Sequence, residues 1–116
     1  MKYKKEHSLQ KRRAEAVRIR NKYPDRIPVV CERYSYSDAP EISKSKYLVP
    51  CDLTVGQFMF VIRKRLALKP DKALFLLSES GKMLPSSYAM SQVYESNKDI
   101  DGFMYFVYAT ESTFGR

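Results

Sequence analysis

The sequence predicts an α+β domain with a mixed four-stranded sheet and two extra N-terminal helices. Three observations point to this fold class. Residues 3–22 have a strongly helical composition, residues 52–68 form a capped amphipathic helix, and four strand-like segments lie before and after that second helix. A chain of 116 residues is expected to form one domain, able to bury about two-thirds of its unfolded surface without a disulfide or metal.

Residues 3–22 are predicted to be helical, either as one long helix or as two helices with a break near Ser8. Pro24 ends this segment, because the residue before a proline is biased away from the α region. The apolar positions are spaced by seven, three and four residues and so share one helical face: Leu9, Ala16, Ile19 and Tyr23.

The next two elements are short strands that can pair antiparallel. Residues 27–33 are rich in β-branched side chains, and residues 34–45 have the Ser, Asp and Ala-Pro composition of a loop. Tyr47–Val49 is predicted to form the second strand. It is flanked by Lys44 and Lys46 before it and by Pro50 after it. This strand suits a sheet edge, where cations and proline prevent accidental pairing.

The clearest helix is predicted for residues 52–68. Thr54 and Gln57 have the spacing of a capping box, in which each side chain accepts a hydrogen bond from the other residue's backbone N–H. Pro70 prevents the helix from continuing. The buried stripe is expected to contain Val55, Phe58, Met59, Ile62 and Leu66.

The remaining elements complete a mixed sheet. Ser86 or Ser87 is expected to cap a helix of one to two turns that ends near Tyr94. We also expect a strand at residues 73–77, a turn at 78–82, a very short strand at 83–84 and a last strand at 103–110. The first and last strands can pair side by side at the centre of the sheet, with the long helix over one face. This order is that of a β-grasp, ubiquitin-like fold.

The charge of the chain is concentrated at its N-terminus. Of the net charge of +8, residues 1–28 carry +7, from ten Lys or Arg and three Asp or Glu. A nearly neutral body with a basic segment could bind nucleic acid, anionic lipid, acidic peptides or tubulin-like acidic surfaces. Since the sequence has neither an RNP-type aromatic motif nor helix-turn-helix spacing, we expect no nucleic-acid partner.

The sequence predicts neither an enzyme nor a metal or cofactor site. It has no evident nucleophile–base pair and no Gly-rich phosphate loop. Cys31 and Cys51 have no Cys or His at metal-ligand spacing and are expected to be free, buried, cytosolic thiols, while His7 is expected at the surface. We see no signal peptide and no run of about 20 apolar residues, so membrane attachment would require a partner or a modification.

Several stretches together resemble one known family. They are Lys11-Arg-Arg13, Lys22–Pro28, Lys46–Pro50, Asp52–Phe58, Ile62–Arg65 and the ending Phe114-Gly-Arg116. In this order they closely resemble the autophagy ubiquitin-like modifier family, to which the GABA-receptor-associated protein and microtubule-associated light chain 3 belong. The resemblance extends over about residues 1–116 in one register with small gaps.

The resemblance implies a groove for extended motifs of the form aromatic-x-x-aliphatic, often preceded by acids. An edge strand suits this role, because a peptide can add to it by β-augmentation. The implied aromatic pocket consists of Glu15, Ile19, Pro28, Lys46, Leu48 and Phe103. The implied aliphatic pocket consists of Tyr47, Val49, Pro50, Leu53, Phe58, Val61 and Arg65. Acids ahead of the motif would meet Arg26, Lys44 or Lys46. Without the resemblance, these apolar side chains would be assigned to core packing.

The resemblance also implies chemistry at the tail. A dedicated cysteine protease would cut between Gly115 and Arg116, just after Phe114. An activating enzyme would then adenylate Gly115, and a thioester relay would pass it to the amine of phosphatidylethanolamine. Glycine suits this position because its carbonyl is approachable and its backbone fits a narrow channel.

The expected organisation is a helical extension at residues 1–25, a ubiquitin-like domain at 26–114 and a processed tail at 115–116. We expect the protein in the cytoplasm and, through its lipid, on the autophagosome or vacuole membrane, where it recruits cargo receptors and adaptors. The alternative is a non-covalent ubiquitin-like scaffold that binds peptides in trafficking or on microtubules, with a tail that is never used.

Overall fold

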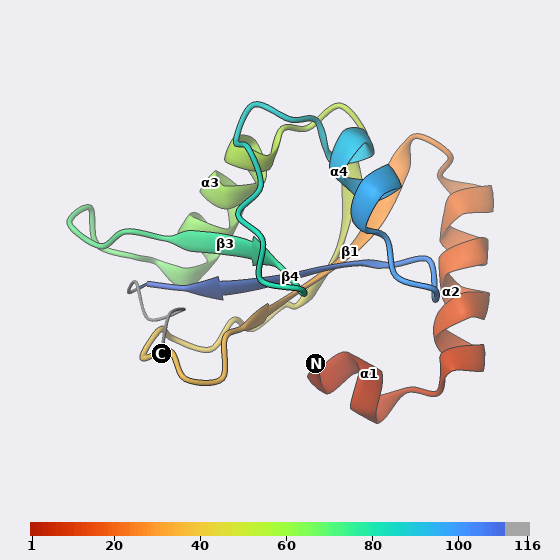
Figure 1. Ribbon diagram of the computed structural model, residues 1–116, viewed down its shortest axis with the longest axis horizontal. Coiled ribbons are helices and arrows are strands. Elements are labelled where there is room, and N and C mark those ends of the chain that lie inside the picture. The colour runs from red at the N-terminus through yellow and green to blue at the C-terminus, as the bar shows by residue number, and fades with distance from the viewer. Residues whose placement is uncertain (111–116) are drawn as a thin grey trace.

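A computed structural model describes residues 1–110 of the chain. Four strands form one sheet of order β2-β1-β4-β3. Figure 1 shows α3 and α4 on one side of this sheet, α1 on the other, and α2 standing at one end. The elements are α1 (Lys2–Glu6), α2 (Leu9–Lys22), β1 (Arg26–Arg33), β2 (Lys46–Pro50), α3 (Val55–Leu66), β3 (Phe75–Ser78), α4 (Met90–Asn97) and β4 (Met104–Ala109).

The first and last strands pair at the centre of the sheet, as predicted. β1 runs parallel to β4 and antiparallel to β2, and β3 runs antiparallel to β4. Burial explains this arrangement: Val29, Val30 and Phe106 on the two central strands are completely buried, as strands covered on both faces must be. The predicted α+β, ubiquitin-like fold with a mixed four-stranded sheet is therefore confirmed.

The sheet separates two hydrophobic clusters. Side chains alternate between the faces of a strand, so Val29 and Cys31 pack toward α3 whereas Val30 packs toward α1 and α2. The cluster under α3 is the main core and contains Phe58, Ile62 and aromatic side chains of β4. The smaller cluster on the opposite face consists of Ala16, Ile19, Val30, Phe103 and Tyr105, with Met1 and Tyr3 packed against it.

The predicted long helix is present but shorter than expected. Thr54 is its N-cap and forms the predicted capping box with Gln57, with hydrogen bonds of 2.9 and 3.1 Å. The helix ends at Leu66 because Ala67 adopts a left-handed conformation with φ of 52°. The buried stripe agrees with the prediction, except that Met59 is only half-buried.

The predicted capping of the last helix by Ser86 or Ser87 is wrong. α4 begins only at Met90, because the preceding segment is held against the start of α3. The backbone carbonyl of Ser86 accepts a 2.9 Å hydrogen bond from the N–H of Gly56, and the carbonyl of residue 88 accepts one of 2.9 Å from Val55. These carbonyls satisfy two of the N–H groups that have no partner within the first turn of a helix.

Other elements also differ from the sequence predictions, mostly at their ends. β3 begins at Phe75 rather than at residue 73, and α4 continues to Asn97 rather than ending near Tyr94. The short strand predicted at residues 83–84 is reduced to a single bridge between Leu77 and Met83. These differences lie at element ends, where local preferences are weakest.

The N-terminal segment forms two helices with a break at Ser8, which is one of the two predicted alternatives. The Ser8 side chain caps α2. Ala16 and Ile19 are buried as expected, Leu9 is half-buried, and Tyr23 is exposed at the end of the helix. The apolar face of α2 is therefore narrower than its sequence spacing suggests.

The remaining side chains of interest lie close to their predicted positions. Cys31 and Cys51 are free thiols, the first buried as predicted and the second only half-buried. His7 is exposed as predicted, and its ring centroid lies 4.6 Å from that of Tyr3. Within residues 1–110, none of the helices has the length and apolar character required to span a bilayer.

Candidate functional site

Strand β2 lies at an edge of the sheet within the described part of the chain. The hydrogen bond from the N–H of Cys31 to the carbonyl of Ser45 measures 2.8 Å and sets the phase of the pairing, so odd-numbered residues of β2 face β1. The backbone groups of Lys46 and Leu48 consequently point outward. Pro28 lies opposite Leu48 in a non-hydrogen-bonded pair, so its missing N–H costs no hydrogen bond to β2.

An open cavity of about 440 Å³ lies between α2 and β2. Alternate residues of β2 face opposite sides of the sheet, so only every second one can reach this cavity. Lys46, Leu48 and Pro50 are on the α2 side, while Tyr47 and Val49 are buried toward α3. The cavity is lined by Glu15, Arg18, Ile19, Lys22, Tyr23, Lys44, Lys46 and Leu48.

Four of the six residues expected in the aromatic pocket line this cavity: Glu15, Ile19, Lys46 and Leu48. Leu48 is 37 % exposed and offers apolar surface to a ligand. Pro28 is buried beside it on β1, and Phe103 is completely buried in the same cluster as Ile19. Pro28 and Phe103 therefore lie beneath the surface of the cavity, next to Leu48 and Ile19 respectively.

Four lining residues were not among the predicted site residues, although Lys44 was expected to meet acids. Arg18 and Lys22 follow Glu15 and Ile19 by three residues, so they lie on the same side of α2. Continuing the helical spacing of the predicted residues would have found them and Tyr23. The lining side chains include four cations and one carboxylate, so the cavity favours an acidic ligand.

Glu15 is the anionic group of the cavity. The ammonium of Lys46 lies 2.9 and 2.8 Å from its two carboxylate oxygens, and the hydroxyl of Tyr3 donates to it at 2.7 Å. Burial acts to raise the pKa of Glu15, but the hydrogen bonds from Lys46 and Tyr3 outweigh burial and lower the pKa below its usual value. Glu15 is therefore ionised at neutral pH.

The residues expected in the aliphatic pocket divide between core and surface. Tyr47, Val49 and Phe58 are buried in the main core, where the rings of Tyr47 and Phe58 meet edge to face at 5.6 Å. The others are half-buried or exposed, with Pro50 at the end of β2, Leu53 between β2 and α3, and Val61 and Arg65 on α3. Arg26, on β1, donates a 3.2 Å hydrogen bond from its guanidinium to the carbonyl of Leu48.

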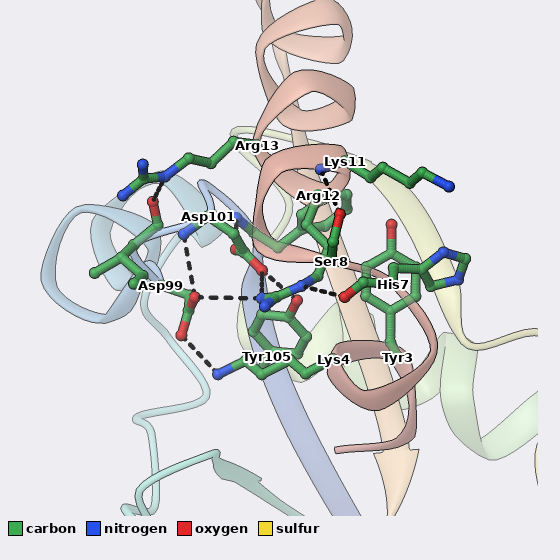
Figure 2. Close-up of polar contacts among 12 residues, drawn as sticks. Tyr3, Lys4, His7, Ser8, Lys11, Arg12, Arg13, Asp99, Asp101 and Tyr105 are labelled. Carbon is green, nitrogen blue, oxygen red and sulfur yellow. Dashed lines mark hydrogen bonds and ion pairs between the residues drawn. The ribbon is translucent and has the colours of Figure 1, made fainter.

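Ion pairs hold the two N-terminal helices against the sheet, and α2 forms one wall of the cavity. Figure 2 shows Arg12 reaching the loop before β4, where its Nη1 lies 2.6 Å from Oδ2 of Asp101. The hydroxyl of Tyr105 donates to the same carboxylate at 2.5 Å. Lys4 of α1 lies 2.7 Å from Asp99. The position of α2 beside the cavity thus depends on charged side chains of α1, of α2 and of the loop before β4.

The residues predicted for cleavage and conjugation, Phe114, Gly115 and Arg116, lie outside the described residues. The family assignment comes from comparison with known proteins. The family model described as "Autophagy protein Atg8 ubiquitin like" matches residues 11–115. The chain belongs to the Atg8 family. Its members are ubiquitin-like modifiers of autophagy, as the sequence resemblance implied.

Individual Atg8 proteins match over nearly the whole chain. The chain is 57 % identical to Autophagy-related protein 8 of Mycosarcoma maydis, covering 98 % of this chain and 96 % of that protein. It is 56 % identical to Autophagy-related protein 8d of Arabidopsis thaliana, covering 97 % and 93 %. The crystal structure of Trypanosoma brucei ATG8 superimposes with a TM-score of 0.91 at 45 % identity, covering 99 % of this chain and 98 % of that one. Membership of the Atg8 family connects the protein to autophagy-pathway partners and to the autophagosome membrane.

Proposed function

We propose that this Atg8-family protein is cleaved after Gly115, conjugated to phosphatidylethanolamine, and recruits receptors with aromatic-x-x-aliphatic motifs to the forming autophagosome. The observation that carries the proposal is the open edge of β2 beside a basic cavity with an apolar floor. In this proposal, residues 1–25 form an extension packed on the core, residues 26–114 the ubiquitin-like domain, and residues 115–116 the processed tail.

A motif peptide would bind in extended form along β2. Its backbone would pair with the outward N–H and C=O groups of Lys46 and Leu48. Its aromatic side chain would enter the cavity against Ile19 and Leu48, and its aliphatic side chain would lie against Leu53 and Val61. Each buried side chain contributes roughly 1.5–3 kcal/mol, and association costs offset part of this gain. We therefore expect micromolar affinity.

Acidic residues ahead of the motif would meet the cations around the cavity. Lys44 and Lys46 line it, and the Arg26 guanidinium lies at the carbonyl of Leu48. Charge attraction at such an exposed rim changes association rate and salt dependence more than intrinsic affinity. The affinity for an acidic motif should therefore fall as ionic strength rises.

The tail would supply the electrophile for conjugation. Hydrolysis of the Gly115–Arg116 peptide bond by a cysteine protease releases arginine and leaves a glycine carboxylate. Adenylation with ATP activates that carboxylate and releases pyrophosphate, and an enzyme thiol then displaces AMP to form a thioester. After transfer between enzyme thiols, the amine of phosphatidylethanolamine displaces the last thiol to form an amide. Two acyl chains then anchor the domain. The catalytic nucleophiles belong to the protease and to the activating and conjugating enzymes.

Mass spectrometry tests the conjugation. Incubation with the processing protease should remove one arginine residue, and protein recovered from cell membranes should carry a glycerophospholipid amide at Gly115. Gly115→Ala should block both changes without affecting the folded domain. A chain that keeps its full mass in both experiments would instead support the non-covalent scaffold.

Calorimetry tests the groove separately. An acidic peptide with both anchor side chains should bind with micromolar affinity, and the same peptide with both anchors replaced by alanine should not bind. Equal affinity for the two peptides would show that the cavity does not recognise the two anchor side chains of the motif.

A further inference from the structure

Three side chains from three different elements meet at Glu15. Tyr3 comes from α1 and donates its hydroxyl at 2.7 Å. Lys46 comes from β2 and contacts both carboxylate oxygens, at 2.9 and 2.8 Å. Arg18, one turn along α2, is a more distant partner at 3.4 Å, and its side chain is 69 % exposed. Glu15 therefore has two close donors, only one of which lines the cavity.

Lys46 has two competing partners when an acidic peptide binds. Its side chain is 42 % exposed, whereas that of Glu15 is 22 % exposed, so the ammonium can turn toward a carboxylate on the ligand while Glu15 stays in place. A partly buried carboxylate that loses its ion-pair partner is destabilised unless another donor remains. The hydroxyl of Tyr3 is the close donor that remains.

We infer that Tyr3 is a positioning residue of the peptide groove, whose hydroxyl stabilises Glu15 when Lys46 moves to an acidic residue of the ligand. The inference rests on the proposed peptide-binding function and explains how the groove can prefer acidic motifs although its own wall contains a carboxylate. Tyr3 thus contributes to specificity without touching the ligand.

The surroundings of Tyr3 suit this role. Its ring packs against Phe103 and His7 at centroid distances of 5.3 and 4.6 Å, and Figure 2 shows it beside His7. Its backbone N–H donates to the carboxylate of Glu32 at 2.9 Å. Burial, together with the hydrogen bond to Glu15, raises the pKa of Tyr3 well above its usual value. The hydroxyl is therefore fixed in position and remains protonated.

The test compares Tyr3→Phe with the unmodified chain, using a motif peptide with upstream Asp and Glu and its Asn and Gln counterpart. The acidic peptide should bind about three- to tenfold more weakly to Tyr3→Phe, the range expected for the net contribution of one typical hydrogen bond. The amide peptide should bind both proteins equally, because it leaves Lys46 on Glu15. Tyr94→Phe is the matched control, since its lost hydroxyl donates to the carbonyl of Gly102 and should not affect either affinity.

A second measurement repeats the comparison in chains that also carry Lys46→Met. Without the ammonium, Tyr3→Phe should no longer discriminate between the two peptides. In the unmodified chain, NMR signals of the Tyr3 ring should shift with the acidic peptide and not with the amide peptide, a readout that needs no variant to fold.

The outcomes separate this inference from the function on which it rests. If Tyr3→Phe binds the acidic peptide as tightly as the unmodified chain, the inference is wrong. An equal loss for both peptides assigns Tyr3 a purely structural role and also overturns it. If the unmodified chain binds neither peptide, the proposed groove itself fails, and the inference fails with it.

Discussion

The guanidinium of Arg12 and the carboxylate of Asp101 form a 2.6 Å ion pair across 89 residues of sequence, and Asp101 is only 1 % exposed. Asp101 also accepts the N–H of Phe103 at 2.8 Å. Next to it, Gly102 has a φ of +91°, and a Cβ there would lie 2.9 Å from the Cβ of Ala16. A glycine is required for α2 to pack this closely on the loop before β4.

Replacing Asp101 by alanine should destabilise the protein by about 3–5 kcal/mol, because the mostly buried Arg12 would lose its closest carboxylate and keep only Asp99, at 3.9 Å. Urea unfolding followed by circular dichroism measures this loss. Glu95→Ala, which removes an exposed pairing with Lys98, should change stability by less than about 0.5 kcal/mol. A similar small effect for Asp101→Ala would show that the pair does not hold the two parts together.

Replacing Glu32 by alanine should release the first helix. The carboxylate of Glu32 accepts the backbone N–H groups of Lys2 and Tyr3 at 2.8 and 2.9 Å, which is the capping role that Met1 does not fill. Loss of a cap costs about 1 kcal/mol. Amide hydrogen exchange of residues 2–6 should accelerate in this variant but not in Glu41→Ala. Unchanged exchange would mean that the ion pairs of Lys4 and the packing of Tyr3 hold α1 without this cap.

Replacing Leu48 by aspartate should abolish motif binding while leaving the fold intact, because Leu48 is exposed at the cavity and the new charge meets the apolar ligand. Tyr47→Ala should behave differently. Tyr47 is buried, packs against Phe58 and donates its hydroxyl to the carbonyl of Lys44 at 2.6 Å, so its loss should cost about 3–5 kcal/mol of stability. Calorimetry and thermal unfolding distinguish the two effects. Tight binding by a folded Leu48→Asp chain would exclude this strand from the site.

Acid should weaken the attachment of the N-terminal helices. Burial acts to raise the pKa of both Glu15 and Asp99, but hydrogen bonds outweigh it and lower both pKa values: those from Lys46 and Tyr3 for Glu15, and those from Lys4 and the Asp101 N–H for Asp99. A carboxyl with a lowered folded-state pKa stabilises the fold above its unfolded pKa, which is about 4. This contribution is lost as pH falls through the lower folded-state pKa.

The free energy of unfolding contributed by these two groups should therefore be constant from pH 7 to pH 5 and fall below about pH 4. Urea titrations at each pH measure the fall. The double variant Glu15→Gln and Asp99→Asn should be less stable at pH 7 and show a shallower decline. A decline of unchanged steepness would assign the acid sensitivity to other carboxyls.

Local sequence signals predicted the elements that depend on neighbouring residues. The Thr54–Gln57 capping box and the stripe of α3 were predictable because both depend on spacings of three and four residues. Pairing of the first and last strands was also predicted, from the order of elements together with the family resemblance. The start of α4 was not predictable, since the hydrogen bond that holds the preceding turn joins the Ser86 carbonyl to the N–H of Gly56, which is distant in the sequence.

The candidate site shows the same division. Glu15, Ile19, Lys46 and Leu48 were predicted through resemblance and do line one cavity. The resemblance did not distinguish the exposed Leu48 from the buried Phe58 and Phe103, because exposure depends on which neighbouring elements cover a side chain. Tyr3 and Glu32 were missed since their importance depends on partners that lie 12 and 29 residues away.

The sequence by itself determined the family, the order of helices and strands, the edge character of β2 and the basic N-terminus, since each depends on residue types and short-range spacing. Only the tertiary structure decided which charges pair and which side chains line the cavity. Ion pairs such as Arg12 with Asp101, and Lys46 with Glu15, form between elements distant in the chain. Their geometry depends on the packing of α1 and α2 against the sheet, which no local pattern encodes.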